Sequence, residues 1–305
     1  MPVADQQAGL ARRMLTPEAL RRLANLNLVS RWVVEGFVSG LHRSPFHGFS
    51  VEFAEYRQYV PGDDLRFLDW AAYGKSDRYY VKKFHSETNL KAHLLLDTSA
   101  SMGYAGNGGP TKLRWAACLT AALARLMTRQ QDAVGLVTFS DRIQKFLSPK
   151  ASPRHLRDLM TVLEAATPSA ETKTGETLHA LAESVKRRGL IVLISDLLDD
   201  PDTVLKGLKH FRHKKHEVIV FHVLDPAEVE FPFEGLADFK DMETGRKMQV
   251  LPLAVREAYL KAMEGFVGRF KKECNESLID YQLALTSSPF DEYLARYLHK
   301  RARVR

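Results

Sequence analysis

Short apolar runs alternate with longer amphipathic segments from residue 90 to the end of the chain. The amphipathic segments have apolar residues at helical spacing and cover 111–130, 152–166, 175–188 and 201–211. The apolar runs have the length of strands, and their nearly unbroken hydrophobicity is typical of strands covered by helices on both faces. They are Ala92 to Leu96, Val134 to Phe139, Leu190 to Ile194, Val218 to Leu224 and Leu278 to Leu285. The pattern predicts an α/β domain with a doubly wound, mostly parallel sheet flanked by helices.

The chain before residue 90 has a different pattern. A possible helix at 16–27 precedes two segments of β-type composition, 51–59 and 78–84, which are separated by the turn-forming stretches "PGDD" and "GKSD". We therefore expect residues 1–88 to be an N-terminal extension that contains a helix and short strands.

Residues 89–305 form the predicted main domain, which ends in elements of a different kind. The stretch 236–251 predicts a hairpin with its turn at Thr244 and Gly245. An amphipathic helix is predicted over 253–273. The main domain is thus expected to include a C-terminal hairpin and further helices.

Composition indicates a globular protein. The chain has 305 residues, 45% of them hydrophobic, and no apolar run of membrane-spanning length. The first residues, "MPVADQQAGLARRML", lack the apolar stretch of a secretory signal, so we expect a cytoplasmic protein without membrane insertion. Cys118 and Cys274 have neither metal-type nor redox-type spacing, and we interpret both as packing residues.

The net charge of +7 raises the question of nucleic-acid binding. The basic residues gather in short clusters such as "KHFRHKK" and "HKRARVR", which lie at the ends of predicted helices. Cations there interact favourably with the helix dipole. Because neither cluster has interleaved aromatic residues or a known nucleic-acid motif, we expect no nucleic-acid partner.

Three oxygen-bearing side chains follow the first strand of the predicted sheet. Asp97, Ser99 and Ser101 stand at alternate positions in "LLLDTSASM". In a doubly wound sheet, ligands bind beyond the carboxyl ends of the strands, which is where Asp97 is expected. A carboxylate and two hydroxyls suit a hard cation that takes oxygen ligands. The same residues also form ordinary turns, so this motif alone is a weak signal.

Two further segments are expected at the same edge of the sheet. Asp196 ends the buried strand in "LIVLISD" and adds a second carboxylate if the two strands are neighbours. Thr172 and Thr174 precede or begin a predicted helix, and either hydroxyl could reach the same ion. Each residue has a structural alternative, as a turn former or a helix cap. Their joint placement favours a metal site.

This combination resembles the von Willebrand factor A domain with its metal-ion-dependent adhesion site. The family pattern has Asp-x-Ser-x-Ser after the first sheet strand, a Thr in a second loop and an Asp in a third. The resemblance implies a divalent cation, Mg²⁺ with Mn²⁺ or Ca²⁺ as alternatives. The implied metal ligands are Asp97, Ser99, Ser101, Thr172 and Asp196, with Thr174 as the alternative to Thr172.

A narrower resemblance covers most of the chain. "GFSVEFAEYRQYVPGDDLRFLDW", "KKFHSETNLKAHLLLDTSASM", "DAVGLVTFSD" and "RRGLIVLISDLLDD" are similar to the bacterial family fifty-eight of the domains of unknown function. Members carry a von Willebrand A-like domain and are often encoded beside MoxR-type AAA+ ATPases. The resemblance implies a MoxR-type ATPase as partner and a role in assembly or maturation of other proteins.

Taken together, the residues predict a non-enzymatic, metal-dependent protein-interaction module, whose partner offers an acidic side chain to the ion. The glycine-rich stretch "GYAGNGGPTK" is not a Walker A motif, because Gly109 and Pro110 stand where such a loop needs other residues. The alternative is an Mg²⁺-dependent hydrolase that uses Asp97 and Asp196 to hold the ion and activate water. No nucleophile or base can be placed beside these aspartates from the sequence.

Overall fold

A computed structural model describes residues 25–41, 53–58, 80–84, 91–106, 108–169, 174–289, 292–294 and 296–298. The chain divides into two compact units, one formed by Met1–Ser44 with Leu90–Arg305 and the other by Pro45–Asn89. The predicted division of the chain at residues 88 and 89 stays a prediction.

A six-stranded sheet forms the centre of the first unit, in the order β10-β7-β6-β3-β4-β5. Its five parallel strands are β3 (Lys91–Asp97), β4 (Ala133–Phe139), β6 (Leu190–Ser195), β7 (Glu217–Leu224) and β10 (Asp280–Leu285). These are the apolar runs of the sequence, and β3, β4 and β6 are buried along almost their whole length. The predicted fold class, a doubly wound and mostly parallel sheet flanked by helices, is confirmed.

The edge strand β5 (Ile143–Lys150) pairs antiparallel with β4 and was not predicted from the sequence. Its side chains are exposed or half-buried throughout, because this strand covers only the margin of the sheet. A strand with that burial has no continuous apolar run, so the hydrophobic pattern that revealed its neighbours is missing here.

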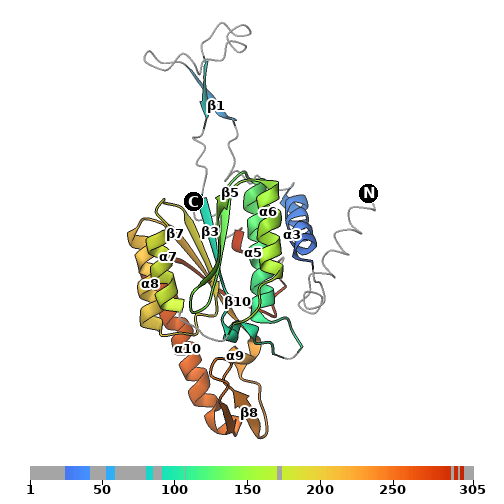
Figure 1. The fold of residues 1–305 in the computed structure, drawn as a ribbon, viewed down its shortest axis with the longest axis vertical. Coiled ribbons are helices and arrows are strands. Elements are labelled where there is room, and N and C mark those ends of the chain that lie inside the picture. The colour runs from blue at the N-terminus through green and yellow to red at the C-terminus, as the bar shows by residue number, and fades with distance from the viewer. Residues whose placement is uncertain are drawn as a thin grey trace. The chain divides into compact units, whose positions relative to one another are not determined.

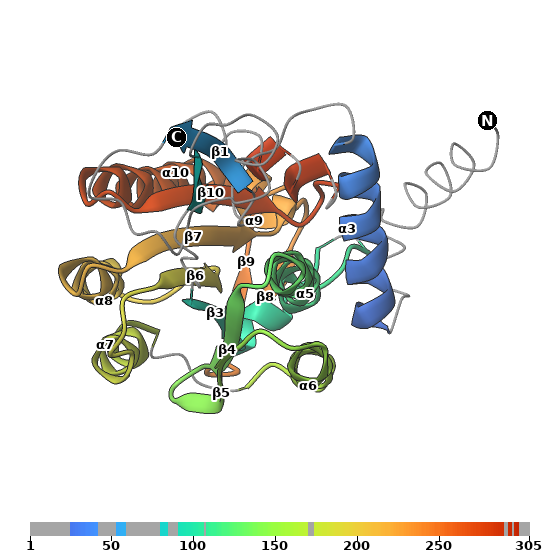
Figure 2. The same ribbon diagram turned by 90° about the horizontal axis from the view of Figure 1, so that it is seen from above.

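Helices cover both faces of the sheet (Figure 2). On one face lie α5 (Lys112–Arg129) and α6 (Pro153–Glu164), with α3 (Leu26–Leu41) packed against both. On the other face lie α7 (Thr174–Ser184) and α8 (Pro201–His213). Each face has its own apolar core, one centred on Trp115 and Leu94, the other on Phe211 and Leu95.

An insertion between β7 and β10 extends from the carboxyl edge of the sheet (Figure 1). It consists of α9 (Pro226–Glu230), an antiparallel hairpin of β8 (Ala237–Lys240) and β9 (Lys247–Val250), and α10 (Pro252–Glu276). The predicted hairpin and the predicted helix at 253–273 are both present. Gly245, in the predicted turn, has a φ of 70°, a value that favours glycine.

The second unit contains β1 (Phe53–Gln58) and β2 (Tyr80–Phe84), which pair antiparallel with an irregularity after Phe53. These strands lie within the two segments of β-type composition. The helix predicted at 16–27 lies mostly outside the described residues, as does the boundary of the extension with β3. Within the described residues, no helix combines the length and the hydrophobicity that crossing a bilayer requires.

Candidate metal centre

Asp97 ends β3, a central strand of the sheet, and its side chain is completely buried. Its Oδ1 atom accepts a 2.8 Å hydrogen bond from the backbone N–H of Ser99, which closes the turn after the strand. Its Oδ2 atom accepts a 2.5 Å hydrogen bond from the hydroxyl of Ser195, at the end of the neighbouring strand β6. Both carboxylate oxygens are therefore held in fixed positions at the carboxyl edge of the sheet.

Ser99 and Ser101 follow in a tight turn that includes the 3-10 helix η2 (Ala100–Gly103). Their hydroxyl oxygens lie 3.1 Å apart, and both side chains are buried. Two hydroxyls directed toward each other beside a carboxylate form a compact group of oxygen atoms. The turn that the sequence predicted thus brings all three side chains to one point.

Asp196 follows β6, which pairs with β3 in parallel register. Its side chain is completely buried, its Oδ1 atom accepts a hydrogen bond from the backbone N–H of Leu198, and it also bonds the Ser101 hydroxyl. The expected second carboxylate therefore reaches the same group of atoms. Its position follows from the order of the strands, since β3 and β6 are neighbours.

The predicted ligand Thr172 lies outside the described residues. Thr174, the alternative, begins α7 and is completely buried. Its hydroxyl oxygen has no hydrogen-bond partner among the described residues. A buried hydroxyl without a partner is costly unless something else binds it, and an ion is one such group.

The segment that leads to these threonines runs beside the Ser99 turn. The backbone N–H of Ser169 donates a 2.8 Å hydrogen bond to the carbonyl of Thr98, and Ser169 bridges to Ser99 in parallel. Five positions therefore separate Thr174 from a residue that is anchored to the aspartate turn. Ser169 therefore lies at the same edge of the sheet as Asp97 and Ser99.

The electrostatics of Asp97 are unusual for a carboxyl group. Burial, together with the neighbouring charge of Asp196, raises the pKa of Asp97 to about 7, against the lowering effect of the hydrogen bonds from Ser195 and Ser99. Two carboxylates placed together without water repel each other, and a cation between them relieves that repulsion.

A buried lysine, which no sequence motif marks, is also part of the site. Lys112 begins α5 and is completely buried, and its Nζ atom donates hydrogen bonds of 2.8 Å to Asp196 Oδ2 and 2.5 Å to Glu228 Oε1. Thr111 caps the helix by accepting a hydrogen bond from the N–H of Arg114, which fixes where α5 begins. The sequence feature that could have indicated this role is a lysine in the first turn of an otherwise buried helix.

Because of Lys112, the pKa values of Asp97 and Asp196 shift in opposite directions. Burial alone would raise the pKa of Asp196, but the Lys112 ammonium, together with the hydrogen bonds from Ser101 and Leu198, outweighs it and holds that pKa below its usual value. Burial also opposes the charge of Lys112, yet the two carboxylates outweigh it and raise the pKa of Lys112. Glu228 shares the same ammonium with fewer hydrogen bonds, and burial keeps its pKa above the usual value.

The donor set fits a hard divalent cation. Its members are carboxylate and hydroxyl oxygens, which Mg²⁺ and Ca²⁺ prefer. When Asp97, Asp196 and Glu228 are ionised, their three negative charges and the one positive charge of Lys112 sum to −2. A divalent cation carries the opposite charge. Among the described residues, no three histidine, cysteine or acidic side chains gather as a metal cluster, so a metal ion at this edge would need the hydroxyl ligands.

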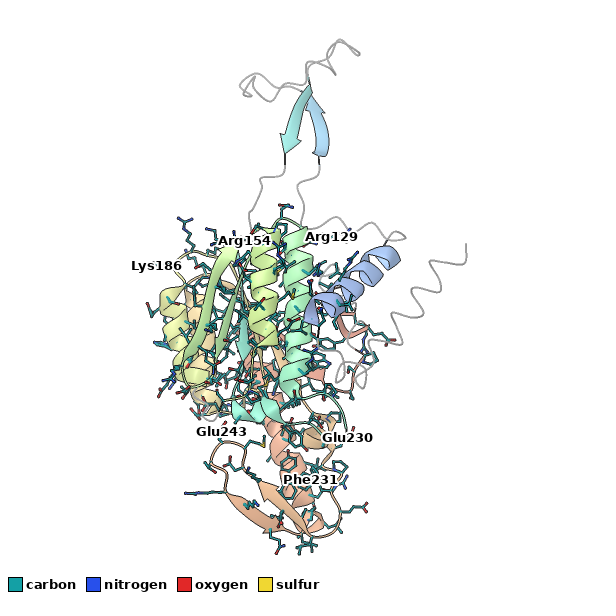
Figure 3. All side chains as sticks on the ribbon, turned by 45° about the vertical axis from the view of Figure 1, so that its right-hand side comes forward. Arg129, Arg154, Lys186, Glu230, Phe231 and Glu243 are labelled. Carbon is teal, nitrogen blue, oxygen red and sulfur yellow. The ribbon has the colours of Figure 1, made fainter. Side chains whose placement is uncertain are left out.

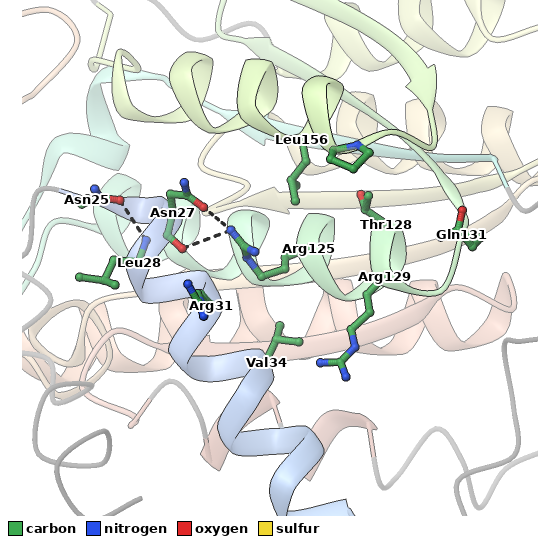
Figure 4. A pocket seen from close by; sticks show the side chains of 11 residues that line it. Asn25, Asn27, Leu28, Arg31, Val34, Arg125, Thr128, Arg129, Gln131 and Leu156 are labelled. Atoms are coloured by element: carbon green, nitrogen blue, oxygen red, sulfur yellow. Dashed lines mark hydrogen bonds between the residues drawn. The ribbon is translucent and has the colours of Figure 1, made fainter. Parts of the chain in front are cut away.

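A cavity of about 690 Å³ lies elsewhere, between α3, α5 and α6 (Figure 4). Its lining includes Arg31, Arg125 and Arg129, and Arg125 is hydrogen-bonded to Asn27 of α3. Lys112 and Arg129 are the two ends of α5, which are about 25 Å apart at the rise of an α-helix. This cavity is therefore separate from the candidate metal centre.

The topology and the place of Asp97 define the class of protein. A doubly wound, mostly parallel sheet with an antiparallel edge strand, and an aspartate at the carboxyl end of a central strand, is a von Willebrand A-like α/β domain. Residues 55–265 match the family described as "Protein of unknown function DUF58". The match covers more than half of the 305 residues, and the chain belongs to this family.

Relatives and similar structures have been found in several bacteria. An uncharacterized protein of Mycobacterium tuberculosis is 27% identical over 251 residues, which are 81% of this chain and 78% of that protein. An uncharacterized protein of Mycobacterium avium is 32% identical over 119 residues, 37% of this chain and 69% of that one. The conserved hypothetical protein BatB of Bacteroides thetaiotaomicron is similar with a TM-score of 0.48 and 20% identity, over 70% of this chain and 99% of BatB. An aerotolerance-related membrane protein of Bacteroides fragilis has a TM-score of 0.49 and 19% identity, over 71% of this chain and all of that one.

Proposed function

We propose that the chain is a metal-dependent protein-interaction module without catalytic activity. The observation that carries this proposal is the group of buried oxygen atoms from Asp97, Ser99, Ser101 and Asp196 at the carboxyl edge of the sheet. Asp97 and Asp196 supply charge, and the serine hydroxyls supply neutral oxygen ligands. A threonine hydroxyl, from Thr172 or Thr174, completes the set.

A bound Mg²⁺, or Mn²⁺ or Ca²⁺ in its place, would supply a positive charge that attracts a carboxylate. The chain's own side chains are too few to fill an octahedral shell, because Asp97 and Asp196 already accept hydrogen bonds from Ser195 and Lys112. A position therefore stays open for an oxygen of another molecule. An acidic side chain of a partner protein fits that position in charge and in chemistry.

Family resemblance supports a MoxR-type AAA+ ATPase as the partner, and assembly or maturation of other proteins as the process. The partner is assigned by analogy between related proteins.

Isothermal titration calorimetry with Mg²⁺ and binding of the purified MoxR-type ATPase test both parts. We expect Mg²⁺ binding and ATPase binding by the wild-type chain, and loss of both in Asp97→Ala and in EDTA. Asp158→Ala is the matched control, because Asp158 is an exposed carboxylate on α6, remote from the site. Binding of the ATPase that persists in Asp97→Ala contradicts the metal-bridged interaction.

The Mg²⁺-dependent hydrolase remains the second candidate, and one observation favours it. Asp97 and Asp196 are both completely buried at the carboxyl edge of the sheet, where two carboxylates would hold an ion that activates water. Phosphatase and nuclease assays with Mg²⁺ distinguish the candidates. Turnover that is lost in Asp196→Ala and kept in Asp158→Ala would replace the binding module by an enzyme.

A further inference from the structure

Exposed apolar side chains gather on the insertion between β7 and β10. Of the eleven large hydrophobic side chains that are exposed among the described residues, six lie within a stretch of twenty residues. We call these six the hairpin surface: Leu236, Met242, Met248, Leu251, Leu253 and Val255. Single exposed apolar residues are common on proteins, but a concentration of them marks an interaction site.

The hairpin surface is exposed although the hairpin has a core of its own. Phe231, Phe233, Phe239 and Tyr259 form that core, with ring centroids 4.4 to 5.7 Å apart. Met248 of β9 pairs with Phe239 of β8 and is nevertheless 65% exposed. The insertion therefore has an aromatic core, and the six side chains remain exposed beside it.

Met242, one of the six residues of the hairpin surface, lies beside the turn of the candidate metal centre. Met242 Cε lies 3.8 Å from the position that a Cβ atom on Gly103 would take, and Gly103 is two residues after Ser101. Figure 3 shows Glu230, Phe231 and Glu243 of this insertion at the end of the unit opposite to Arg129, Arg154 and Lys186. The apolar residues and the oxygen ligands thus belong to the same end of the domain.

Buried and partly buried polar contacts connect the insertion to the metal-site turns. Lys112 joins Asp196 of the metal centre to Glu228 of α9. The carbonyl of Glu228 in turn accepts a 2.9 Å hydrogen bond from the Tyr259 hydroxyl of α10. The backbone N–H of Gly106, in the loop after the metal-site turn, donates to Asp225 Oδ2 at 3.1 Å. A ligand that contacts both features meets a preformed surface.

The charges of the insertion indicate the kind of ligand. Between Leu236 and Val255 there are three acidic residues and three basic ones, so the net charge of the stretch is zero. Anionic membrane surfaces are bound by apolar side chains together with an excess of lysine and arginine, which is missing here. A protein segment with apolar side chains needs no such excess.

We propose that the hairpin surface binds apolar side chains of the same partner segment whose carboxylate reaches the metal ion. The ligand is a polypeptide segment in which an aspartate or glutamate stands close to two or more aliphatic residues. This inference rests on the proposed function, in which a carboxylate of the partner reaches the ion. It adds apolar contacts, which select one acidic segment over another. Methionine and leucine suit this role because their flexible side chains adapt to apolar partners.

Selection from a phage-displayed library of random peptides, with Mg²⁺ present, tests the proposal. The baits are the wild-type chain, Met248→Glu/Leu253→Glu, Asp97→Ala and Leu278→Glu. Leu278→Glu is the matched control, because Leu278 is 77% exposed and precedes β10 at the other edge of the sheet. Met248 and Leu253 are each 65% exposed, so the double variant is expected to keep its fold, which circular dichroism verifies.

The wild-type chain and Leu278→Glu are expected to enrich peptides with an acidic residue next to aliphatic ones. The double variant should lose the aliphatic preference, keep the acidic one, and bind the best wild-type peptide about tenfold more weakly. An aliphatic preference that is unchanged in the double variant overturns the inference. An acidic preference that persists in Asp97→Ala contradicts the proposed function instead, so the two failures are distinguishable.

Two companion measurements test whether the hairpin surface binds a membrane or a second copy of the chain instead. Sedimentation with phosphatidylglycerol vesicles that is lost in the double variant would assign the hairpin surface to a membrane. Dimers in analytical ultracentrifugation that the double variant dissociates would assign it to a second copy of the chain. Either result would overturn the proposal of an acidic, apolar partner segment.

Discussion

The Nζ atom of Lys112 donates a 2.8 Å hydrogen bond to Asp196 Oδ2, and both side chains are completely buried. Taking two charges out of water costs several kcal/mol for each ion, which the attraction between them only partly offsets. Such a pair is therefore weak support for a purely stabilising role. Its position, with Asp196 at the candidate metal centre and Glu228 on the insertion, explains its presence better.

Replacing Lys112 by methionine is expected to destabilise the protein strongly. Asp196 and Glu228 would be left buried without their counter-ion, and breaking a buried pair in this way costs about 3 to 5 kcal/mol of unfolding free energy. Urea denaturation in EDTA measures the change. Lys209→Met is the control, since the Lys209 pair with Glu273 is exposed and contributes about 1 kcal/mol or less.

Equal losses in the two lysine variants would show that the burial of Lys112 has no energetic consequence. A second test separates charge from packing. Glu228→Gln combined with Lys112→Met removes one of the two stranded carboxylates, so the double variant should be more stable than the sum of the two single changes predicts.

The pH dependence of stability should report the raised pKa of Asp97. A carboxyl group whose pKa is about 7 in the folded protein and about 3.9 in the unfolded chain binds its proton more tightly when folded. Its contribution to the unfolding free energy is therefore largest at low pH and falls as the pH rises toward 7. In EDTA, the wild-type chain should lose stability relative to Asp97→Asn between about pH 4 and about pH 7, and the difference should level off above that range.

Mg²⁺ should reverse this loss in the wild-type chain, because the ion binds the ionised carboxylate and displaces its proton. Thermal unfolding at both pH values, with and without Mg²⁺, gives the comparison. A wild-type chain whose stability relative to Asp97→Asn does not change with pH would contradict a raised pKa. Asp158→Asn, at an exposed position, controls for the charge change itself.

Glycines set the packing between α7, which begins at Thr174, and α8. A Cβ atom on Gly175 would lie 2.5 Å from Thr203 Cγ2 and 2.8 Å from the Thr203 backbone carbon. Gly175→Ala should therefore force the helices apart at a cost of about 1 to 3 kcal/mol. Gly265→Ala is the matched control, because nothing lies within 4 Å of that position in α10, and alanine should stabilise the helix by about 0.5 to 1 kcal/mol. Denaturation midpoints that move in the same direction for both variants would contradict the close packing at Gly175.

The hydrophobic pattern predicted the centre of the fold because the parallel strands are buried on both faces. Asp97 and Asp196 could be placed at one edge for the same reason, since parallel neighbours end together. The edge strand β5 was missed because its side chains are exposed. Lys112 was missed because its burial depends on Asp196 and Glu228, which are distant in the sequence and meet it only in the folded domain.

Single substitutions can decide whether Thr172 or Thr174 is the metal ligand. The hydroxyl of Thr174 is buried without a partner among the described residues, so replacing it by a methyl group in Thr174→Val removes no hydrogen bond within that part of the chain. Stability in EDTA should stay within about 1 kcal/mol of the wild type, or rise. If the hydroxyl is a metal ligand, the Mg²⁺ affinity measured by calorimetry should fall about tenfold or more. Thr172→Val is the companion variant. An affinity lost only in Thr172→Val would identify Thr172 as the ligand, and leave the buried Thr174 hydroxyl a structural feature of the start of α7.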